Sequence, residues 1–421
     1  MAHTDRLNPS SPAHGGPLRI CIPAETYLPE MNGAATFTNR LATGLAARGH
    51  EVHVIAPSAT GSDRHDVEDG VHVHRIRSHR WMPHPTWTIC MPWETAPRVA
   101  GLLDDIRPDV VHTQAHFVLG RYAITEAKKR GIPVVGTNHF MPDNVRPYVR
   151  VPRLVEDAGV SAAWWDLRRT FGRVDVLTVP TQLAADLLTV NRWDRPVRAV
   201  SCGIDLSRFA EAPSAPDTTV SSDVTASSDT TAGGTADGGT VAEGDPTVLF
   251  VGRLSKEKNA HEIVDAIAAT DPDLGLRAVI IGAGDQDTVI RDRARELGVE
   301  DRIDLRGKVS DAELDAALRT ATLFCMPGTA ELQSIATLEA LAAGRPVVLA
   351  DAVALPHLCD GENGTLFRPH DTDDLARALS EVAGASAAER ARMGEASRRV
   401  AARHDIAHTL DTFEGIYRSL I

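Results

Sequence analysis

Two carboxylates flank a loop that could hold a phosphate. Glu331 and Glu339 lie eight residues apart in the stretch 327–350, where a β-type run ends in a glycine-containing loop and an Ala/Leu-rich helical segment follows. A helix start offers free backbone N–H groups and the positive end of the helix dipole, which attract phosphate. Eight helical residues span about 12 Å, so each carboxylate could accept hydrogen bonds from hydroxyls on one side of the phosphate. A nucleotide-sugar has this layout, with one sugar on each side of a diphosphate.

Glutamates at this spacing are most often solvated carboxylates on a helix face, so other strand ends must supply the specificity. Arg253 and Lys258 follow a second apolar strand, and two cations there could neutralise a diphosphate, at about 1.5–3 kcal/mol for each charge-assisted hydrogen bond. A solvated basic loop is the alternative. Gly282 and Gly284 are typical of the start of a dinucleotide fingerprint, but its third glycine would fall at Asp287. This argues against a nicotinamide site.

The first half of the chain offers a histidine and a glycine at strand ends. His139 closes the strand-like run 133–139, and Gly33 follows the first strand, where the absence of a Cβ lets backbone approach a ligand phosphate. A lone histidine is usually structural, but one at the carboxyl end of a strand that faces a cleft between domains is as often functional as not. His72 and His74, two apart on one strand face, suggest a metal, but no third ligand is apparent. We therefore expect no metal site.

The elements that must position these residues alternate between strands and helices. Apolar runs predict strands over residues 18–24, from Glu51 onward, and over 71–76, 110–114, 133–139, 176–181 and 197–204. The alternation resumes with TVLFVGRL, RAVIIGAG, RIDLRG, TLFCMPG and PVVLAD. This order predicts two doubly wound α/β domains. Because ligands of such sheets bind at the carboxyl ends of the strands, we expect the site in a cleft between the domains.

Composition sets the expected domain limits. Residues 1–17 are predicted to form a disordered tail and 18–205 the first domain. The Ser/Thr/Gly-rich stretch 211–245 has acidic residues but no Lys or Arg, and it cannot bury enough apolar surface to offset its ordering entropy. We predict it to be a disordered insertion. Residues 246–400 form the second domain, and 401–421 a C-terminal helix that we expect to return to the first.

The overall composition is that of a soluble globular protein. The 421 residues are 43% hydrophobic and 24% charged, which fits two or three domains. No apolar run approaches the roughly 18 residues of a membrane span, and the first 17 residues lack the apolar core of a signal peptide. We expect a cytoplasmic protein with no nucleic-acid partner. The five cysteines are scattered, which predicts neither a disulfide framework nor a zinc site.

The motifs VGRLSKEKN, GAGDQ, GKVSDAEL, ELQSIATLEALAAGRPVV and ENGTLFRP, in this order, resemble the family-4 retaining glycosyltransferases. The resemblance covers nearly the whole chain outside the tail and the insertion, and it implies the GT-B fold, in which two Rossmann-like domains face a central cleft. The resemblance implies a role for each candidate residue. Arg253 and Lys258 would hold the donor diphosphate, Glu331 would bind the hydroxyls of the transferred sugar, Glu339 would bind the ribose, and His139 would contact the sugar at the reaction centre. Gly33 would bring backbone to the phosphates, Leu332, Gln333 and Ser334 would complete the loop that binds the donor, and Lys308 and Val309 would line the base.

The chain departs from many family members in the donor loop. They have Glu-Gly-Phe-Gly, whereas this chain has Glu-Leu-Gln-Ser at residues 331–334. The glutamine, together with NHFMPDN, is similar to the branch that glycosylates membrane lipids, such as the diacylglycerol glucosyltransferases. The segment AETYLPEMNGAATFTNRLATGLAARGHEV is similar to mannosyltransferases of phosphatidylinositol and glycolipid assembly.

The resemblance thus implies transfer of glucose or mannose, from UDP-glucose or GDP-mannose, to a lipid or glycolipid hydroxyl. The configuration would be retained, and neither a metal nor another cofactor would be needed. A soluble acceptor is the first alternative. A nucleotide-sugar epimerase and a non-catalytic nucleotide-binding module are the others.

Residues 146–175 suggest contact with a membrane. Six arginines stand against four acidic residues there, with Trp164, Trp165 and several aliphatic residues between them. An anionic bilayer attracts and partly buries such a segment, which would place the protein on the inner face of the plasma membrane. The alternative is that both tryptophans belong to the core and that the arginines are merely solvated.

Overall fold

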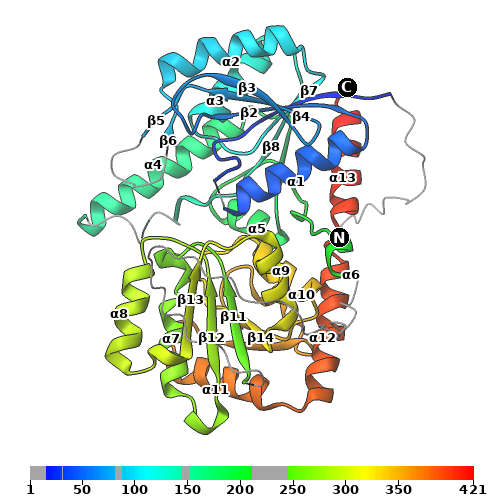
Figure 1. The fold of residues 1–421 in the computed structure, drawn as a ribbon. Helices are drawn as coiled ribbons and strands as arrows, with labels where there is room; N and C mark the ends of the chain where they lie inside the picture. The colour runs from blue at the N-terminus through cyan, green and yellow to red at the C-terminus, as the bar shows by residue number, and fades with distance from the viewer. Residues whose placement is uncertain (1–15, 31, 81–87, 144–145, 147–150, 211–244) are drawn as a thin grey trace, which may run out of the picture.

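Two parallel β-sheets, each covered by helices, form the two halves of the molecule (Figure 1). The computed structural model describes residues 16–30, 32–80, 88–143, 146, 151–210 and 245–421. Nearly all of the predicted tail 1–17 and of the predicted insertion 211–245 lies outside these residues. The α/β fold class predicted from the sequence is confirmed.

The first sheet has the strand order β10-β9-β8-β7-β1-β2-β4-β3. All neighbouring strands are parallel except β3, which runs antiparallel to β4 at the edge. The order reverses between β1 and β7, so the crevice at their carboxyl ends is where a ligand of this fold binds. The strands are β1 Arg19–Pro23, β2 Glu51–Pro57, β3 Arg64–Glu68, β4 Val71–Ile76, β7 Val110–Thr113, β8 Val134–Thr137, β9 Val176–Val179 and β10 Val197–Ala199.

Helices flank this sheet. Helix α1 starts at Gly33 because the side chain of Asn32 accepts a hydrogen bond from the backbone N–H of Ala35 and so caps its free end. Its buried face, which includes Phe37 and Leu41, packs into the core of the first domain. The helices are α1 Gly33–Ala47, α2 Pro92–Ile106, α3 Val118–Lys129, α4 Arg153–Phe171, α5 Gln182–Val190 and α6 Ser207–Ala210. Strand β5 His79–Arg80 pairs antiparallel with β6 Thr88–Ile89.

The second sheet is entirely parallel, with the order β13-β12-β11-β14-β15-β16. Its order reverses between β11 and β14, which places a second ligand crevice at their carboxyl ends. The strands are β11 Thr247–Val251, β12 Arg277–Ile281, β13 Ile303–Gly307, β14 Leu323–Met326, β15 Val347–Ala350 and β16 Gly364–Phe367, and the helices are α7 His261–Ala269, α8 Asp287–Leu297, α9 Asp311–Thr320, α10 Ile335–Ala342, α11 Thr372–Gly384 and α12 Ala387–Ala402.

The last helix, α13 (Ile406–Arg418), lies against the first domain (Figure 1). Phe413 and Tyr417 are fully buried in the core of that domain. The Tyr417 hydroxyl lies 2.7 Å from His112 Nδ1, and His112 Nε2 lies 2.6 Å from Thr137 Oγ1. Just before α13, Asp405 pairs in parallel with Ile204. The linker after β10 and the return before α13 therefore run side by side.

All the predicted strands are present, and the described residues form four further strands that were not predicted. Strand β3 (RHDVE) is polar and largely solvent-facing, so it carries no apolar signal. Strands β5 and β6 have two residues each. Strand β16 lies in the ENGTLFRP motif, which contributes to the family resemblance but was not predicted to form a strand.

Tyr417→Phe should destabilise the protein without changing its fold. The change leaves His112 Nδ1 without its partner inside the core, at a cost of about 1–3 kcal/mol. Urea unfolding of the whole chain measures this loss. Tyr122→Phe, at a partly exposed position of α3, is the matched control. A difference below about 0.5 kcal/mol between the two variants would contradict a structural role for the buried network.

Candidate active site

The candidate donor site lies where the strand order of the second sheet reverses. Arg253 and Lys258 lie in the loop that follows β11, and Glu331 lies in the loop that follows β14. These two strands are neighbours, paired at Val248 with Leu323 and at Leu249 with Phe324. The fold therefore brings together cations and a carboxylate that are more than 70 residues apart in the sequence.

Lys258 and Glu331 form a partly buried ion pair. Lys258 ends a short 3-10 turn, Lys256–Lys258, and its Nζ donates to Glu331 Oε1. Glu331 is only 8% exposed. The predicted diphosphate cation and the predicted sugar-binding carboxylate thus fix each other's position. A pair that is held before the donor arrives needs little reorganisation when charge develops in the reaction.

Arg253 is surrounded by acidic groups. Its Nη2 donates to Glu257 Oε1 at 3.2 Å, and its Nε has no hydrogen-bond partner among the described residues. Burial lowers the pKa of Arg253, and the charges of Asp285, Glu331 and Glu30 counteract this effect. Glu30 belongs to the first domain, after β1. The arginine therefore sits at the junction of the two domains and keeps unused hydrogen-bonding capacity.

Helix α10 begins at Ile335, and Ser334 caps it by accepting from the backbone N–H of Thr337. Glu331 lies before this helix in an irregular loop, so the helical separation of about 12 Å predicted between Glu331 and Glu339 is wrong for the first half of the interval. Glu339 lies inside the helix and is 7% exposed.

Cationic groups from outside α10 hold the Glu339 carboxylate. Arg40 of α1 donates its Nη2 to Glu339 Oε1, and Arg208 Nη1 of α6 lies 3.5 Å from the same oxygen. Arg40 Nη1 is buried and has no partner among the described residues. The carboxylate predicted to bind ribose is therefore held by an arginine of the first domain.

Leu332 and Gln333 direct their side chains away from the loop and into the domain junction. Leu332 belongs to the core of the first domain, and its carbonyl oxygen accepts from Thr181 Oγ1 at 3.0 Å. Gln333 Oε1 accepts from the backbone N–H of Cys202 at 2.7 Å, and Gln333 Nε2 donates to Ser201 Oγ at 3.1 Å. Ser201 Oγ in turn lies 2.9 Å from His404 Nδ1. Gln333 thus joins the donor loop to both chain segments that connect the domains.

Gly33 lies opposite the donor loop, and Lys308 and Val309 lie farther away. A Cβ at Gly33 would stand 4.0 Å from Ile335 Cδ1, so the start of α1 and the start of α10 are close to each other. Lys308 is exposed and Val309 partly buried, and both follow β13, which is two strands from β11. That offset is about 10 Å, the distance at which a base attached to the diphosphate could lie.

His139 follows β8 in the first domain and is partly buried. Its Nε2 lies 3.1 Å from Gln114 Oε1, and its ring packs 5.0 Å from that of Phe37. Burial lowers the pKa of His139 to about 4, so the ring is neutral at pH 7. A neutral imidazole can exchange hydrogen bonds with a sugar without adding a charge to the site.

Sequence reasoning did not find Arg40, Glu30 or Gln114. Arg40 carries no local signal, because its partner Glu339 is 299 residues away. Glu30 lies between β1 and the start of α1 at Gly33, and Gln114 directly follows β7. The rule that selected His139, a polar residue at the end of a buried strand, would also have selected Gln114.

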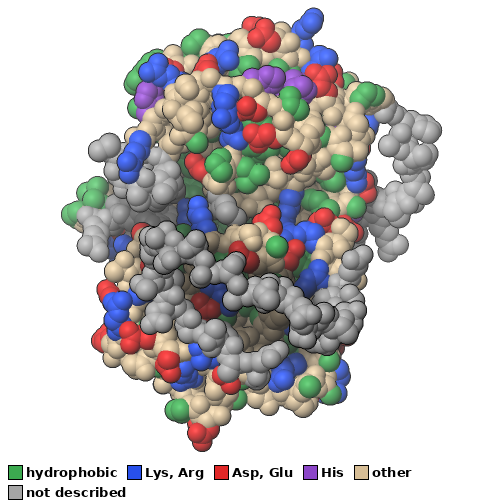
Figure 2. Space-filling model, in the orientation of Figure 1, with side chains coloured by type: hydrophobic (Ala, Val, Ile, Leu, Met, Phe, Trp, Pro, Cys, Tyr) green, Lys and Arg blue, Asp and Glu red, His purple; other side chains and the backbone are tan. Residues whose placement is uncertain are grey.

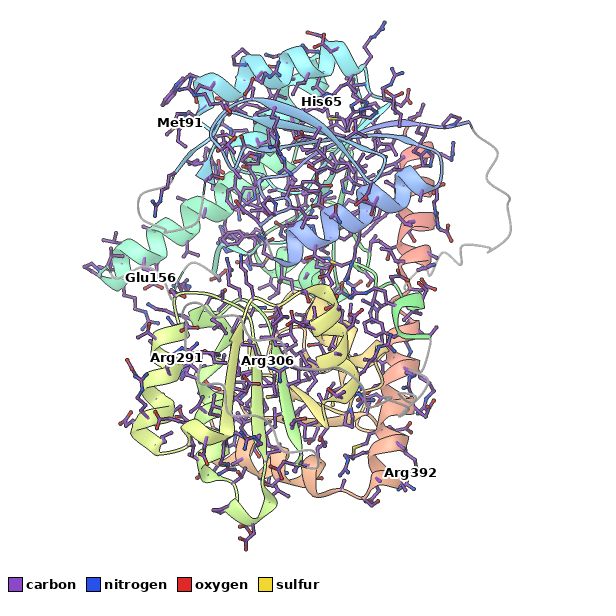
Figure 3. The ribbon with its side chains drawn as sticks, in the orientation of Figure 1. His65, Met91, Glu156, Arg291, Arg306 and Arg392 are labelled. Atoms are coloured by element: carbon purple, nitrogen blue, oxygen red, sulfur yellow. The ribbon has the colours of Figure 1, made fainter. Side chains whose placement is uncertain are left out.

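A cluster of four histidines occupies the outer part of the first sheet, where the sequence suggested His72 and His74 as a weak metal pair. His53, His65, His72 and His74 stack there with ring separations of 4.5–5.7 Å, and Figure 3 labels His65. Within the part of the chain that the structure describes, no group of three or more His, Cys, Asp or Glu residues could hold a metal ion. In the same part, no helix is long and apolar enough to cross a membrane.

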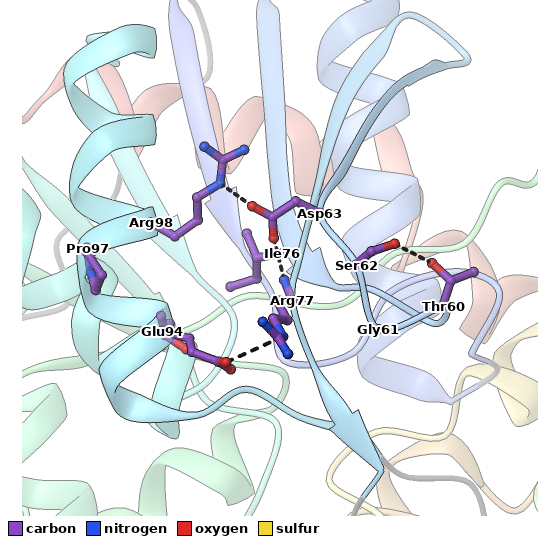
Figure 4. Close-up of a pocket in the computed structure, with 10 residues that line it drawn as sticks. Thr60, Gly61, Ser62, Asp63, Ile76, Arg77, Glu94, Pro97 and Arg98 are labelled. Atoms are coloured by element: carbon purple, nitrogen blue, oxygen red, sulfur yellow. Dashed lines mark hydrogen bonds and ion pairs between the residues drawn. The ribbon is translucent and has the colours of Figure 1, made fainter.

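An open hollow of about 800 Å³ lies in the first domain beside α2 (Figure 4). The charged groups on its wall pair with each other: Arg98 with Asp63 at 2.9 Å and Arg77 with Glu94 at 3.4 Å. None of the predicted site residues lines it. Along the line between the two domains, by contrast, Lys/Arg and Asp/Glu side chains lie close together (Figure 2).

Comparison with known proteins gives the family. The model of glycosyltransferase family 4 matches residues 31–208, and that of glycosyl transferases group 1 matches residues 237–400. A GDP-mannose-dependent alpha-mannosyltransferase of Mycolicibacterium smegmatis is 31% identical, and the alignment covers 91% of this chain and 92% of that enzyme. The chain belongs to the family-4 glycosyltransferases. It is a hexosyltransferase that uses a nucleotide-sugar donor, so the epimerase and the non-catalytic alternatives are set aside.

Further comparisons agree with this family assignment. An alpha-monoglucosyldiacylglycerol synthase of Streptococcus pneumoniae is 25% identical over 87% of this chain and 78% of its own. The sucrose-phosphate synthase structure from Thermosynechococcus elongatus superposes with a TM-score of 0.74 at 18% identity, covering 96% of this chain and 99% of the other. The predicted GT-B architecture and the resemblance to the glycolipid branch are confirmed.

Lys258→Ala and Glu331→Ala should each lower hexose transfer by about 100- to 1,000-fold, because each removes a charged contact to the donor worth about 2.7–4 kcal/mol in the transition state. The double variant should lose little more than either single one, since the two side chains act as a pair. Initial rates at saturating and limiting donor measure both effects.

Lys256→Ala, in the same 3-10 turn, is the control and should stay active. Circular dichroism should show all variants folded. If both single variants kept more than about a tenth of the wild-type turnover, the assignment of Lys258 and Glu331 to the site would be lost.

Proposed function

We propose that this family-4 glycosyltransferase moves mannose from GDP-mannose to a hydroxyl of a lipid or glycolipid acceptor, with retention of configuration. The similarity to the mycobacterial GDP-mannose-dependent alpha-mannosyltransferase carries this proposal, because it extends over nine-tenths of both chains. A second such enzyme, from Mycobacterium tuberculosis, is 29% identical over 84% of this chain.

In the proposed site, both domains contact the donor. Arg253 and Lys258 neutralise the diphosphate as it leaves, together with the backbone N–H groups at the start of α10, which Ser334 caps. Glu331 accepts from the hydroxyls of the transferred sugar and Glu339 from the ribose. The first domain supplies Gly33 against the phosphates and His139 beside the sugar.

Retention requires that the acceptor hydroxyl attack from the face that the diphosphate leaves. The described residues offer no evident carboxylate nucleophile for the opposite face of the sugar, so we propose direct transfer through an oxocarbenium-like state rather than a covalent sugar–enzyme intermediate. The leaving diphosphate, held by Arg253 and Lys258, is then the base nearest to the acceptor proton.

Glucose transfer from UDP-glucose to diacylglycerol is the second candidate. Two alpha-monoglucosyldiacylglycerol synthases, from Streptococcus pneumoniae and Acholeplasma laidlawii, are 25% and 26% identical to this chain. Both candidates share the reaction class and a lipid-linked acceptor, and they differ in base and sugar.

Incubation of the protein with radiolabelled GDP-mannose or UDP-glucose and a bacterial lipid extract should decide between the candidates. We expect label in the organic phase with GDP-mannose, at a rate at least about tenfold above that with UDP-glucose. Label transferred faster from UDP-glucose would favour the second candidate. Label that enters only water-soluble products, with either donor, would overturn a lipid acceptor and favour a soluble one.

We also propose that the first turns of α4 attach the enzyme to the membrane surface that holds the acceptor. This end of α4 projects from the first domain (Figure 1), and apolar side chains lie exposed there (Figure 2). Leu154 is 85% exposed and Val155 57%, and Arg153 beside them is exposed as well. An apolar tip with an adjacent cation suits the interface of an anionic bilayer.

The arginines contribute less to this surface than the sequence suggested. Arg146 is paired with Asp143, Glu156 and Asp157, so its charge is balanced within the protein. Arg150 lies outside the described residues. Trp164 is a core residue, as the alternative interpretation held, and its Nε1 donates to Asp143. Trp165, on the other hand, is 55% exposed, with Arg169 stacked over its ring at 5.1 Å.

The double variant Leu154→Glu with Val155→Glu should reduce cosedimentation with phosphatidylglycerol vesicles by at least about tenfold. It removes two apolar side chains, each worth about 1.5–3 kcal/mol when fully buried, and adds repulsion from the anionic surface. Val190→Glu and Val289→Glu, at exposed apolar positions of α5 and α8, are the matched controls.

The wild-type protein should be released as salt rises past the screening range. If the wild-type protein bound neutral and anionic vesicles equally, or bound neither, the result would contradict membrane attachment through α4. It would also contradict a peripheral position on the inner face of the plasma membrane.

A further inference from the structure

A buried amide beside His139 keeps an unused hydrogen-bond donor. Gln114 directly follows β7 and is 3% exposed. Its Oε1 lies 3.1 Å from His139 Nε2, while its Nε2 has no hydrogen-bond partner among the described residues. Buried polar side-chain atoms are paired in the large majority of cases, so an unpaired one at a strand end points to a ligand.

The position of Gln114 in the fold supports a ligand at this place. The order of the first sheet reverses between β1 and β7, and ligands of doubly wound sheets bind at the carboxyl ends of the strands at such a reversal. The backbone N–H of Gln114 donates to the carbonyl oxygen of Pro23 at 3.0 Å, which joins the ends of these two strands. Gln114 is therefore held rigidly at the reversal point.

The contact with His139 defines the hydrogen on the imidazole. An amide oxygen can only accept, so His139 Nε2 must carry the hydrogen and leave Nδ1 bare. Phe37 packs against the same ring at 5.0 Å and helps to fix its orientation. A change at Gln114 would therefore alter the tautomer and the position of His139.

We propose that Gln114 is a further binding residue of the transfer site, where its Nε2–H₂ donates to a hydroxyl of the transferred hexose while its Oε1 holds His139 in the Nε2–H form. This inference rests on the proposed function. A sugar hydroxyl suits the place because it is an uncharged acceptor. The diphosphate, by contrast, has its cations, Arg253 and Lys258, in the second domain.

Calorimetric titration of the whole protein tests the donor contact. Gln114→Leu should bind GDP and UDP as tightly as wild type, because the nucleoside diphosphate does not touch this residue. It should lose about tenfold in affinity for the matching nucleotide-sugar or in kcat, the loss that one hydrogen bond represents. Gln114→Met keeps the side-chain volume and should behave in the same way, which guards against a folding effect. Gln182→Leu, at the exposed start of α5, is the control.

Two results would overturn the donor contact. One is an equal loss of affinity for the nucleoside diphosphate and for the nucleotide-sugar, and the other is a wild-type transfer rate in both Gln114 variants. A wild-type protein that binds neither nucleotide nor nucleotide-sugar would instead overturn the proposed function.

Nitrogen NMR of histidine-labelled protein tests the contact with His139 without any activity assay. We expect the Nε2–H form of His139 in wild type and its loss in Gln114→Leu. Gln114→Glu should raise the pH at which His139 titrates, because a carboxylate at this distance favours the imidazolium. The acid limb of kcat/KM should shift to higher pH in the same variant. A wild-type His139 with its hydrogen on Nδ1, or a titration that Gln114→Glu leaves unchanged, would overturn the proposed arrangement.

Discussion

Contacts between the two domains hold the candidate site together. Leu332 of the donor loop packs into the core of the first domain, and Arg40 of the first domain pairs with Glu339 of the second. A buried carboxylate without a counter-charge is strongly disfavoured, so Glu339 can be this deeply buried only because an arginine approaches from the opposite domain. The proposed nucleotide-sugar site therefore depends on contacts between the two domains.

The same principle explains why the site cations are not free. Lys258 is neutralised by Glu331, and Arg253 donates to Glu257 with the charge of Glu30 nearby. In the proposed site, an entering diphosphate would share these cations with the carboxylates already present. The cations would then already lie where the leaving group develops its charge.

The fold and much of the site could be predicted because their signals are local. The apolar runs that form β1, β11 and β8, for example, can be seen within a few residues of sequence, and the strand ends they predict lead directly to Gly33, Arg253 and His139. What the sequence could not reveal depends on contacts between distant residues.

No spacing rule connects Arg40 with Glu339, and none connects Gln333 with Cys202. The sequence also does not show that Leu332, just before α10, packs on the core of the other domain.

The Leu-Gln pair that replaces the usual Gly-Phe has a consequence for motion of the domains. Gln333 contacts Cys202 and Ser201 in the linker, and Ser201 contacts His404 in the return, so the loop that faces the donor is also bonded to the segments about which the domains would rotate. If a bound donor stabilised one arrangement of the two domains, that arrangement would raise the affinity for the donor by the same factor. A rotation of one domain against the other about these segments would have to break these hydrogen bonds or carry the loop of Glu331 with it.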